Sequence, residues 1–285
     1  MREILLVIGR GIGQVMFQNN AFSGLLMLVG IALNSWILAL LAFGGNIVST
    51  LAAWLSGYSH DDIRNGLYGF NGTLVGIAVG VFLELNLMSV LLLVITAWLS
   101  TWITYILKKQ DKLPGFTAPF IISVWILLAV CRYFLSSLLL QEPTADEVQN
   151  SFDLFRAFSF HIGQVMFQGD NLFTGLFFLL GILVNSPLNA VYAVLGALLP
   201  LGMYWFTGED YSVLNAGIFG YNAVLCAIAL GDCSWRGFLW SVLSVLLSVV
   251  LQIAGMRVGI TTLTAPFVLS VWIVMGMRQL IKSPK

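Results

Sequence analysis

Two glutamines occupy matching places in apolar stretches of this sequence. Gln14 lies three residues before Phe17, and Gln164 lies three residues before Phe167, with Val165 between them. An amide buried without partners in an apolar environment costs about 2–7 kcal/mol, so each glutamine needs a hydrogen-bond partner. One interpretation is a hydrogen bond between helices. The other is an amide that lines a pore and offers a solute one acceptor and two donors, and the recurrence of the pair favours it.

A second matching pair of aromatic residues is Phe70 and Tyr221, each followed four residues later by a leucine, Leu74 or Leu225. The three residues directly after each aromatic are small or polar, which predicts the end of a helix or a break in it. Aromatic side chains in membrane proteins commonly serve packing or interfacial anchoring. The alternative is a slot of facing rings, with the leucines as its other wall, which admits a planar molecule and excludes a hydrated ion. The rings of such slots are Phe17, Phe70, Phe167 and Tyr221.

A third matching pair consists of two threonines, Thr117 and Thr264, each directly before Ala-Pro-Phe. Proline lacks a backbone donor and disfavours helical geometry in the residue before it, so both points are predicted helix starts or breaks. A threonine at such a point either caps the helix or turns its hydroxyl toward a pore. The sequence leaves these two interpretations equal.

The composition places these candidates in a membrane protein. The chain is 59% hydrophobic and only 9% charged, whereas a soluble domain carries roughly 25% charged residues. The formal net charge is zero, which argues against nucleic acid as a partner. We therefore expect an all-α integral membrane protein surrounded by lipid.

No pattern in the sequence predicts an enzyme, a metal site or a cofactor. The cysteines Cys131, Cys226 and Cys233 lack the spacing of metal ligands, and no nucleotide-binding or catalytic motif occurs. The few charged residues in apolar segments lie toward segment ends, where long side chains reach the membrane surface. A transporter driven by protons or sodium usually needs an acid near the midplane, so we expect passive conduction.

The sequence repeats itself with an offset near 150 residues. Ile12–Gln18 is identical to Ile162–Gln168, and the aromatic and threonine motifs recur in the same order. Such a series of matches indicates a duplication. We expect two membrane repeats, residues 1–141 and 155–285, joined by an acidic external linker at residues 142–154.

Each repeat contains about six apolar segments. Several are too short or too interrupted to cross a membrane, which favours re-entrant or half helices beside a water-filled path. In the first repeat they lie near residues 3–18, 21–33, 35–57, 66–85, 86–107 and 116–140. In the second they lie near residues 155–168, 171–184, 187–206, 217–231, 236–256 and 264–281.

Loop charges predict the orientation. Lysines 108, 109 and 112 share one short loop, and basic residues also mark the C-terminal end, so both belong in the cytoplasm. With both termini in the cytoplasm and the acidic linker outside, each repeat must cross an odd number of times. We therefore expect two inverted homologous repeats around a central pore, each with about five transmembrane helices plus one re-entrant helix.

The paired motifs make the sequence resemble the urea transporter family over nearly its whole length. They are QVMF at Gln14 and Gln164, GFN-x-x-L and GYN-x-x-L at Gly69 and Gly220, and TAPF at Thr117 and Thr264. The resemblance implies a bacterial member that conducts urea down its gradient, with ten spanning and two re-entrant helices per subunit. It also implies a homotrimer in the bacterial cytoplasmic (inner) membrane, each subunit with its own pore.

By this resemblance, the rings and leucines form two selective slots, the two glutamines stand near the slot mouths, and the threonines line the narrow middle. Two positions depart from the family pattern. Gln164 replaces a glutamate found in some bacterial members, and Tyr221 replaces the usual phenylalanine. Either change could shift selectivity, so the alternative function is a channel for another small neutral solute, such as short amides, ammonia or water. A membrane enzyme or a scaffold without a pore is disfavoured by the duplicated polar and aromatic motifs.

Overall fold

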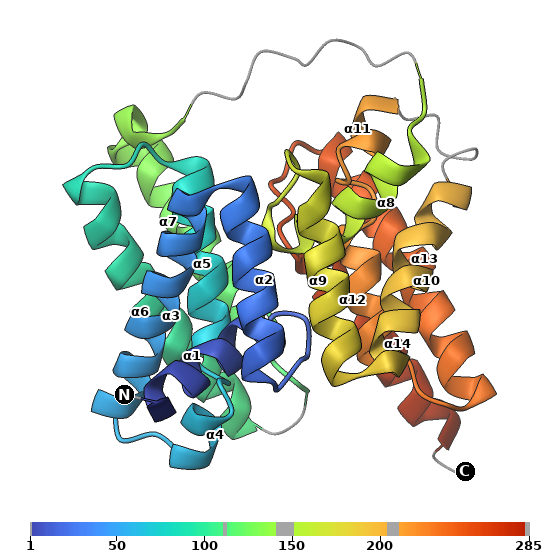
Figure 1. Cartoon of the computed structure of the whole chain (residues 1–285), viewed down its shortest axis with the longest axis horizontal. Coiled ribbons are helices and arrows are strands. Elements are labelled where there is room, and N and C mark those ends of the chain that lie inside the picture. The colour runs from blue at the N-terminus through green and yellow to red at the C-terminus, as the bar shows by residue number, and fades with distance from the viewer. Residues whose placement is uncertain (1, 111–112, 141–150, 204–210, 283–285) are drawn as a thin grey trace. The chain divides into compact units, whose positions relative to one another are not determined.

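The computed structural model describes residues 2–110, 113–140, 151–203 and 211–282, and these residues are overwhelmingly helical. The only strand-like pairing in these ranges is an isolated bridge between Leu83 and Leu139. The all-helical prediction is therefore confirmed. The chain divides into two compact units, unit 1 (residues 1–144) and unit 2 (residues 145–285) (Figure 1).

The two units contain their helices in the same order. In unit 1 they are α1 (Arg2–Gln14), α2 (Ala21–Asn34), α3 (Trp36–Leu55), α4 (His60–Arg64), α5 (Gly69–Phe82), α6 (Leu87–Gln110), α7 (Ala118–Phe134) and the 3-10 turn η1 (Ser136–Leu138). In unit 2 they are α8 (Leu154–Gly163), the 3-10 turn η2 (Gln164–Met166), α9 (Leu172–Asn185), α10 (Pro187–Met203), α11 (Tyr211–Asn215), α12 (Tyr221–Leu230), α13 (Trp235–Arg257) and α14 (Ala265–Lys282).

The same kinds of residue start the second and third helices of both units. The side chain of Asn20 caps α2, and that of Asn171 caps α9, by accepting hydrogen bonds from the first backbone amides. A serine then separates the second helix from the third, because Ser35 and Ser186 adopt an extended backbone that neither helix can continue. These polar stops lie between apolar runs, and for this reason the helix boundaries follow the sequence closely.

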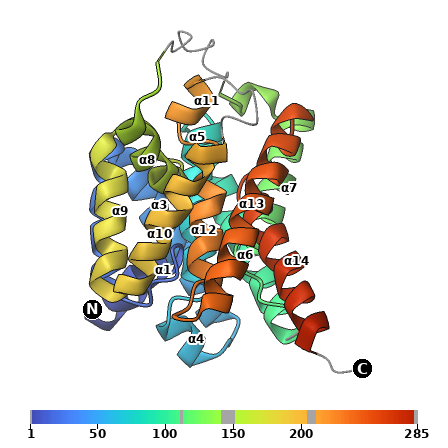
Figure 2. The same cartoon turned by 90° about the vertical axis from the view of Figure 1, so that its right-hand side faces the viewer.

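Each unit packs its helices as a row of neighbours. In unit 2, α9, α10, α12, α13 and α14 follow one another side by side (Figure 2). Unit 1 repeats this order with α2, α3, α5, α6 and α7. In unit 1, α3 and α5 approach so closely that a Cβ on Gly76 would overlap the Leu41 carbonyl oxygen. Small residues at such crossings let helices approach without a hydrophobic driving force between them.

The long helices are polar toward the protein and apolar toward the outside. In α6 the buried side includes Ser100, Thr101 and Thr104, whereas Ile95 and Trp102 are exposed. In α13 the same holds, with buried Ser241, Ser244, Ser248 and Gln252 against exposed Leu239, Leu246 and Val250. This polarity is the reverse of that of a soluble helix and fits lipid as the surrounding solvent.

In the described part of the chain, three helices are long and apolar enough to cross a membrane by length and composition: α3, α6 and α13. Most of the other apolar helices have only 10–17 residues. The predicted presence of short segments is therefore confirmed. The division of each repeat into five crossings and one re-entrant helix remains a prediction.

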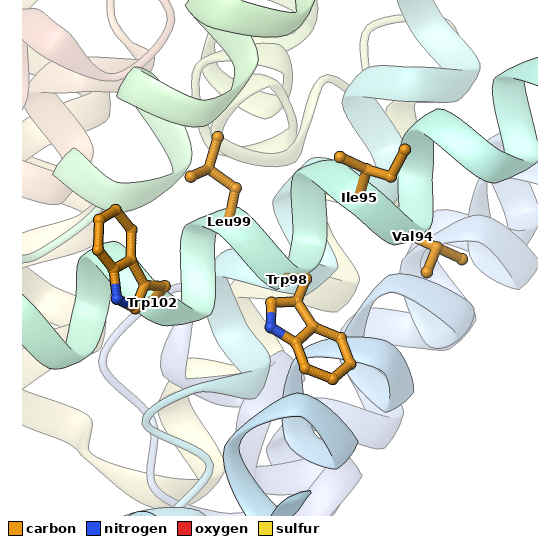
Figure 3. Close-up of a pocket in the computed structure, with 5 residues that line it drawn as sticks. All are labelled: Val94, Ile95, Trp98, Leu99 and Trp102. Atoms are coloured by element: carbon orange, nitrogen blue, oxygen red, sulfur yellow. The ribbon is translucent and has the colours of Figure 1, made fainter. Parts of the chain in front are cut away.

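One shallow groove lies on the outer side of α6, lined by Val94, Ile95, Trp98, Leu99 and Trp102 (Figure 3). All five residues come from this single helix, and none of them is a candidate site residue. Its lining is almost entirely apolar, so it offers a polar solute nothing in exchange for its hydration. We therefore regard it as part of the lipid-facing surface.

The break predicted directly after Phe70 and Tyr221 is wrong, because Asn71–Thr73 and Asn222–Val224 lie inside α5 and α12. The chain breaks before these helices instead, after the short helices α4 and α11, which the apolar pattern did not predict because they are only five residues long. The linker residues 142–150, Lys112 and the last three residues lie outside the described ranges.

Candidate solute-binding site

The glutamine motif of unit 1 sits where a helix ends in a tight turn. Helix α1 ends at Gln14, and Phe17 follows in the left-handed backbone region with φ of 63°. Gln18 fastens this turn twice: its backbone N–H donates to the Gly13 carbonyl at 2.9 Å, and its side-chain Nε2 donates to the Met16 carbonyl at 2.6 Å. The fully buried Gln18 therefore uses its amide to hold the backbone turn that carries Phe17.

Unit 2 repeats the left-handed phenylalanine and both hydrogen bonds of this turn. Phe167 has φ of 60°, the backbone N–H of Gln168 donates to the Gly163 carbonyl at 3.1 Å, and its Nε2 donates to the Met166 carbonyl at 2.6 Å. Val165, directly after Gln164, is almost completely buried. Both phenylalanine side chains remain partly exposed while their neighbours are buried.

The two candidate glutamines make the same hydrogen bond. Gln14 Nε2 donates to the Asn65 carbonyl at 3.1 Å, and Gln164 Nε2 donates to the Ala216 carbonyl at 3.0 Å. These carbonyls belong to the short stretches before α5 and α12, so each glutamine ties the first helix of its unit to the start of the motif helix. Because each amide nitrogen donates to a carbonyl, the amide oxygen Oε1 is the part of the group that can act as an acceptor.

A second strained position lies directly before each candidate threonine. Phe116 has φ of 45° and Leu263 has φ of 49°, and with Phe17 and Phe167 they are the only non-glycine residues with positive φ in the described part of the chain. A bulky residue held in this region costs about 1–3 kcal/mol and tends to occur at functional sites. These two residues could not be recognised as special from the sequence, because nothing in their type predicts a left-handed backbone.

Phe116 supplies an aromatic partner for Phe17. The two rings lie edge to face, with centroids 5.9 Å apart and planes at 75°. The predicted slot joined Phe17 to Phe70, and that pairing remains a prediction. Unit 2 has Leu263 in the place of Phe116, so its turn presents an aliphatic side chain where unit 1 presents a ring.

The aromatic and leucine motif occupies the first two turns of α5 and of α12. Leu74 and Leu225 are almost completely buried, and Phe70 is only 8% exposed. Tyr221 is partly exposed, but its hydroxyl is engaged: it donates to the Leu263 carbonyl at 2.5 Å and lies 3.2 Å from Thr262 Oγ1. The extra hydroxyl of unit 2 thus bonds to the protein itself.

An asparagine within each motif joins the motif helix to the threonine helix. Asn71 Oδ1 accepts from the Phe120 backbone N–H at 3.2 Å in unit 1. Asn222 Oδ1 accepts from the Phe267 N–H at 3.1 Å in unit 2. These amides belong to the first turns of α7 and α14, where the helix itself provides no acceptor. The sequence offered a signal, since both asparagines are part of the repeated GFN and GYN motifs, but their role was not predicted.

The candidate threonines are buried at the starts of α7 and α14. Thr117 and Thr264 are 3% and 2% exposed, and the predicted helix starts are confirmed because these helices begin at Ala118 and Ala265. Thr117 stands at the N-cap position of α7, yet its side chain makes no capping hydrogen bond. The capping interpretation is therefore wrong for Thr117.

Each unit thus holds its own set of glutamine, aromatic, leucine and threonine side chains on broken or starting helices. The asparagine and glutamine hydrogen bonds connect three chain segments in each set. In the described residues no group of three histidine, cysteine or acidic side chains is placed to bind a metal ion. The chemistry available at these positions is hydrogen bonding from uncharged groups, together with the flat faces of aromatic rings.

Comparison with known proteins relates these sets to a transport family. A family model described as "Urea transporter" matches residues 5–279. Urea transporter 1 of Rattus norvegicus is 31% identical over 241 residues, covering 78% of this chain and 61% of its own length. The Ovis aries protein of the same name is 30% identical over 284 residues, covering 92% and 73%. The chain therefore spans about three fifths of the length of the rat relative. On the extent of the family match, this chain belongs to the urea transporter family.

Proposed function

We propose that this chain is a channel-type facilitative transporter that passes urea down its concentration gradient through a narrow pore formed where its two repeats meet. The observation that carries the proposal is the repeated glutamine geometry, in which Gln14 and Gln164 each bond a backbone carbonyl through Nε2. The Oε1 atoms of the same two amides are suited to accept hydrogen bonds from the amino groups of urea. Family membership supports the same solute.

Urea fits these side chains because it is planar and neutral, with two amino groups that donate and one carbonyl that accepts. Aromatic faces hold a flat molecule, while oxygens in its plane replace the water that it loses. Conduction requires that this replacement be favourable enough for entry and weak enough for release. A hydrated ion gains no equivalent of its shell from such a surface, so ions are excluded.

We assign the same roles in both repeats. Gln14 and Gln164 stand near the mouths of two slots, and the threonines line the narrow middle. The slot walls are Phe17, Phe70 and Leu74 in one repeat, and Val165, Phe167, Tyr221 and Leu225 in the other, and the middle is lined by Thr117 and Thr264. None of these side chains carries a charge at neutral pH, which supports conduction without coupling to protons or ions.

The arrangement in the membrane belongs to the same proposal. The repeats, residues 1–141 and 155–285, are inverted relative to each other, with the linker 142–154 outside and both termini in the cytoplasm. Lys108 and Lys109 at the end of α6 support this orientation through the excess of positive charge in cytoplasmic loops. By family resemblance, the chain forms a homotrimer in a bacterial inner membrane, with one pore per subunit.

Purified protein in proteoliposomes provides the test. Stopped-flow light scattering should report urea uptake that is independent of any proton or sodium gradient. Uptake abolished by dissipating a proton gradient would refute passive conduction. If the protein takes up short amides or ammonia but not urea, and urea does not compete with them, the channel conducts another solute.

Two single variants test the site that carries the proposal. Gln14→Leu and Gln164→Leu each remove the acceptor and the bond to a helix-end carbonyl, and each should lower urea flux at least about tenfold, equivalent to about 1.4 kcal/mol. Gln279→Leu is the matched control, because Gln279 is exposed on α14 away from the candidate residues, and it should leave flux unchanged. Full transport by both site variants would support a protein without a pore at these residues.

A further inference from the structure

The hydroxyl of Tyr221 is the clearest chemical difference between the two repeated sites. Its counterpart in unit 1 is Phe70, which has no hydroxyl. A tyrosine beside a slot suggests an additional ligand for the solute. The hydrogen bonds of Tyr221 point to another role.

The single hydrogen of this hydroxyl is already committed. At 2.5 Å the acceptor is the Leu263 carbonyl, which has no hydrogen to give, so Tyr221 must be the donor. Thr262 Oγ1 lies 3.2 Å away and, with that hydrogen used, takes the donor role toward the tyrosine oxygen. A phenol has one donor and two acceptor sites. No hydrogen therefore remains for the carbonyl of urea.

The residue that receives this bond is one of the strained ones. Leu263 has φ of 49°, a conformation that a branched side chain adopts only when its surroundings impose it. Asn222 Nδ2 donates to the same carbonyl at 3.3 Å. Two donors from the first turn of α12 thus converge on the carbonyl directly before Thr264, the proposed middle-lining residue.

We propose that Tyr221 is a positioning residue: its hydroxyl latches the left-handed turn at Leu263 and thereby fixes Thr264 and the first turn of α14. The selectivity of unit 2 is then set by where the latch holds this turn, and not by a phenol presented to the solute. The transport consequence rests on the proposed function, whereas the latch itself does not.

Amide hydrogen exchange tests the latch without reference to transport. The Ala265 and Val268 amides donate to Thr262 and Thr264 at 3.1 and 3.2 Å and report on the turn. Unit 1 offers internal references at the matching positions, because Ala118 donates to Gly115 at 2.9 Å and Ile121 donates to Thr117 at 3.0 Å. In Tyr221→Phe, exchange at residues 265 and 268 should rise about tenfold, or about 1.4 kcal/mol, while residues 118 and 121 stay unchanged.

Tyr192→Phe is the matched control. Tyr192 also donates its hydroxyl to a backbone carbonyl within unit 2, that of Asp232 at 2.7 Å, but at a different place. This variant should leave the exchange of Ala265 and Val268 as it is. Thr262→Val removes only the 3.2 Å partner and should give a smaller rise than Tyr221→Phe. If Tyr221→Phe does not fold, unchanged exchange in Thr262→Val contradicts the latch.

Transport separates a positioning residue from a solute ligand. With the latch lost, urea flux should stay within about threefold of the unaltered protein, while discrimination against a bulkier amide such as N-methylurea weakens severalfold. Reduced urea flux in Tyr221→Phe with unchanged amide exchange would overturn the proposal and make the phenol a ligand. Absence of urea flux in the unaltered protein would refute the proposed function instead, and the exchange result would still decide the latch.

Discussion

In each unit, a large polar side chain fills the space between the first and third helices, but it comes from a different helix in each unit. We call this side chain the filler. In unit 1, Asn46 projects from α3 against Gly11 of α1 and is completely buried. In unit 2 the counterparts are reversed in size: the small residue is Ala197 of α10, and the large one is His161 of α8, also completely buried. The glycine that begins the motif faces the filler in both cases, since a Cβ on Gly69 would strike Asn46 and one on Gly220 would strike His161.

The two fillers differ in how well they are satisfied. Asn46 Nδ2 donates to Thr73 Oγ1 at 2.9 Å and to the Ile8 carbonyl at 3.3 Å. His161 Nδ1 lies 2.7 Å from the Ala197 carbonyl, to which it must donate, and its Nε2 has no partner within the described residues. The position of Thr73 is taken by Val224 in unit 2.

This difference separates two kinds of constraint. Close packing requires only that the filler have the right volume. Either of the two neighbouring helices can therefore supply it, provided that the facing residue on the other helix is small. The bonds of the glutamine Nε2 and asparagine Oδ1 atoms around the candidate site end on backbone groups, whose positions change little when side chains change. For that reason the amides recur unchanged in both units, whereas the fillers have been exchanged.

The largest effect should come from moving the filler. His161→Gly leaves a cavity and should lower the free energy of unfolding by about 3 kcal/mol, within the range for large-to-small core changes. Ala197→Asn alone should overpack and cost about 1–3 kcal/mol. The double variant reproduces unit 1 and should recover much of the loss, and adding Val224→Thr should recover more. Thermal unfolding in detergent measures each variant, and strictly additive single effects would contradict the exchange of fillers.

The asparagines should follow with a smaller effect. Asn71→Ala and Asn222→Ala each leave a buried helix-start amide without its acceptor, which costs about 1–3 kcal/mol. Asn222 also donates to Gln252 Oε1 at 3.1 Å and to Leu263, whereas Asn71 Nδ2 donates to Thr104 Oγ1 at 3.3 Å. The change in unit 2 should therefore lower the unfolding temperature more. If both variants lower the unfolding temperature equally, the additional hydrogen bond from Asn222 to the Leu263 carbonyl does not contribute to stability.

The turn side chains come next. Phe116→Leu makes the turn of unit 1 resemble that of unit 2 and removes the edge-to-face contact with Phe17. Such aromatic pairs contribute about 0.5–1.5 kcal/mol beyond the area that they bury, so stability should fall by about 1 kcal/mol. Phe116→Tyr keeps the ring and is the control. If the Phe116→Leu protein is as stable as the unaltered one, the contact between Phe116 and Phe17 does not stabilise unit 1.

The smallest effect concerns the only ion pair that joins α4 to α6 in the described part of unit 1, between Asp62 and Lys108. Unit 2 has Val213 at the place of Asp62, so its equivalent is uncharged. Because the pair is partly exposed, Asp62→Asn should cost at most about 1 kcal/mol, and the loss should vanish in high salt. Asp61→Asn serves as the control, and a large or salt-insensitive loss would argue against a screened surface pair.

Much of the fold was predictable because the boundaries of its helices depend on residues that are close together in the sequence. Apolar runs bounded by Asn20, Ser35 or Pro119 define helices through capping and through the missing proline donor, and the observed boundaries follow them. The break near Phe70 was misplaced, since Asn71 and Gly72 are typical turn residues that tertiary contacts retain inside α5. The position of Asn71 inside α5 is stabilised by its hydrogen bond to the first turn of α7, nearly fifty residues later in the sequence.

By itself the sequence determined the duplication, the membrane solvent and the types of side chain at the paired sites, because repetition and hydropathy need no knowledge of contacts. The tertiary structure decided how those side chains are used. Which atom of Gln14 remains an acceptor, and whether the Tyr221 hydroxyl is available, depend on carbonyls of Asn65 and Leu263 that lie some forty to fifty residues away. Backbone groups are the same at every residue, so a sequence cannot identify which of them a side chain will meet.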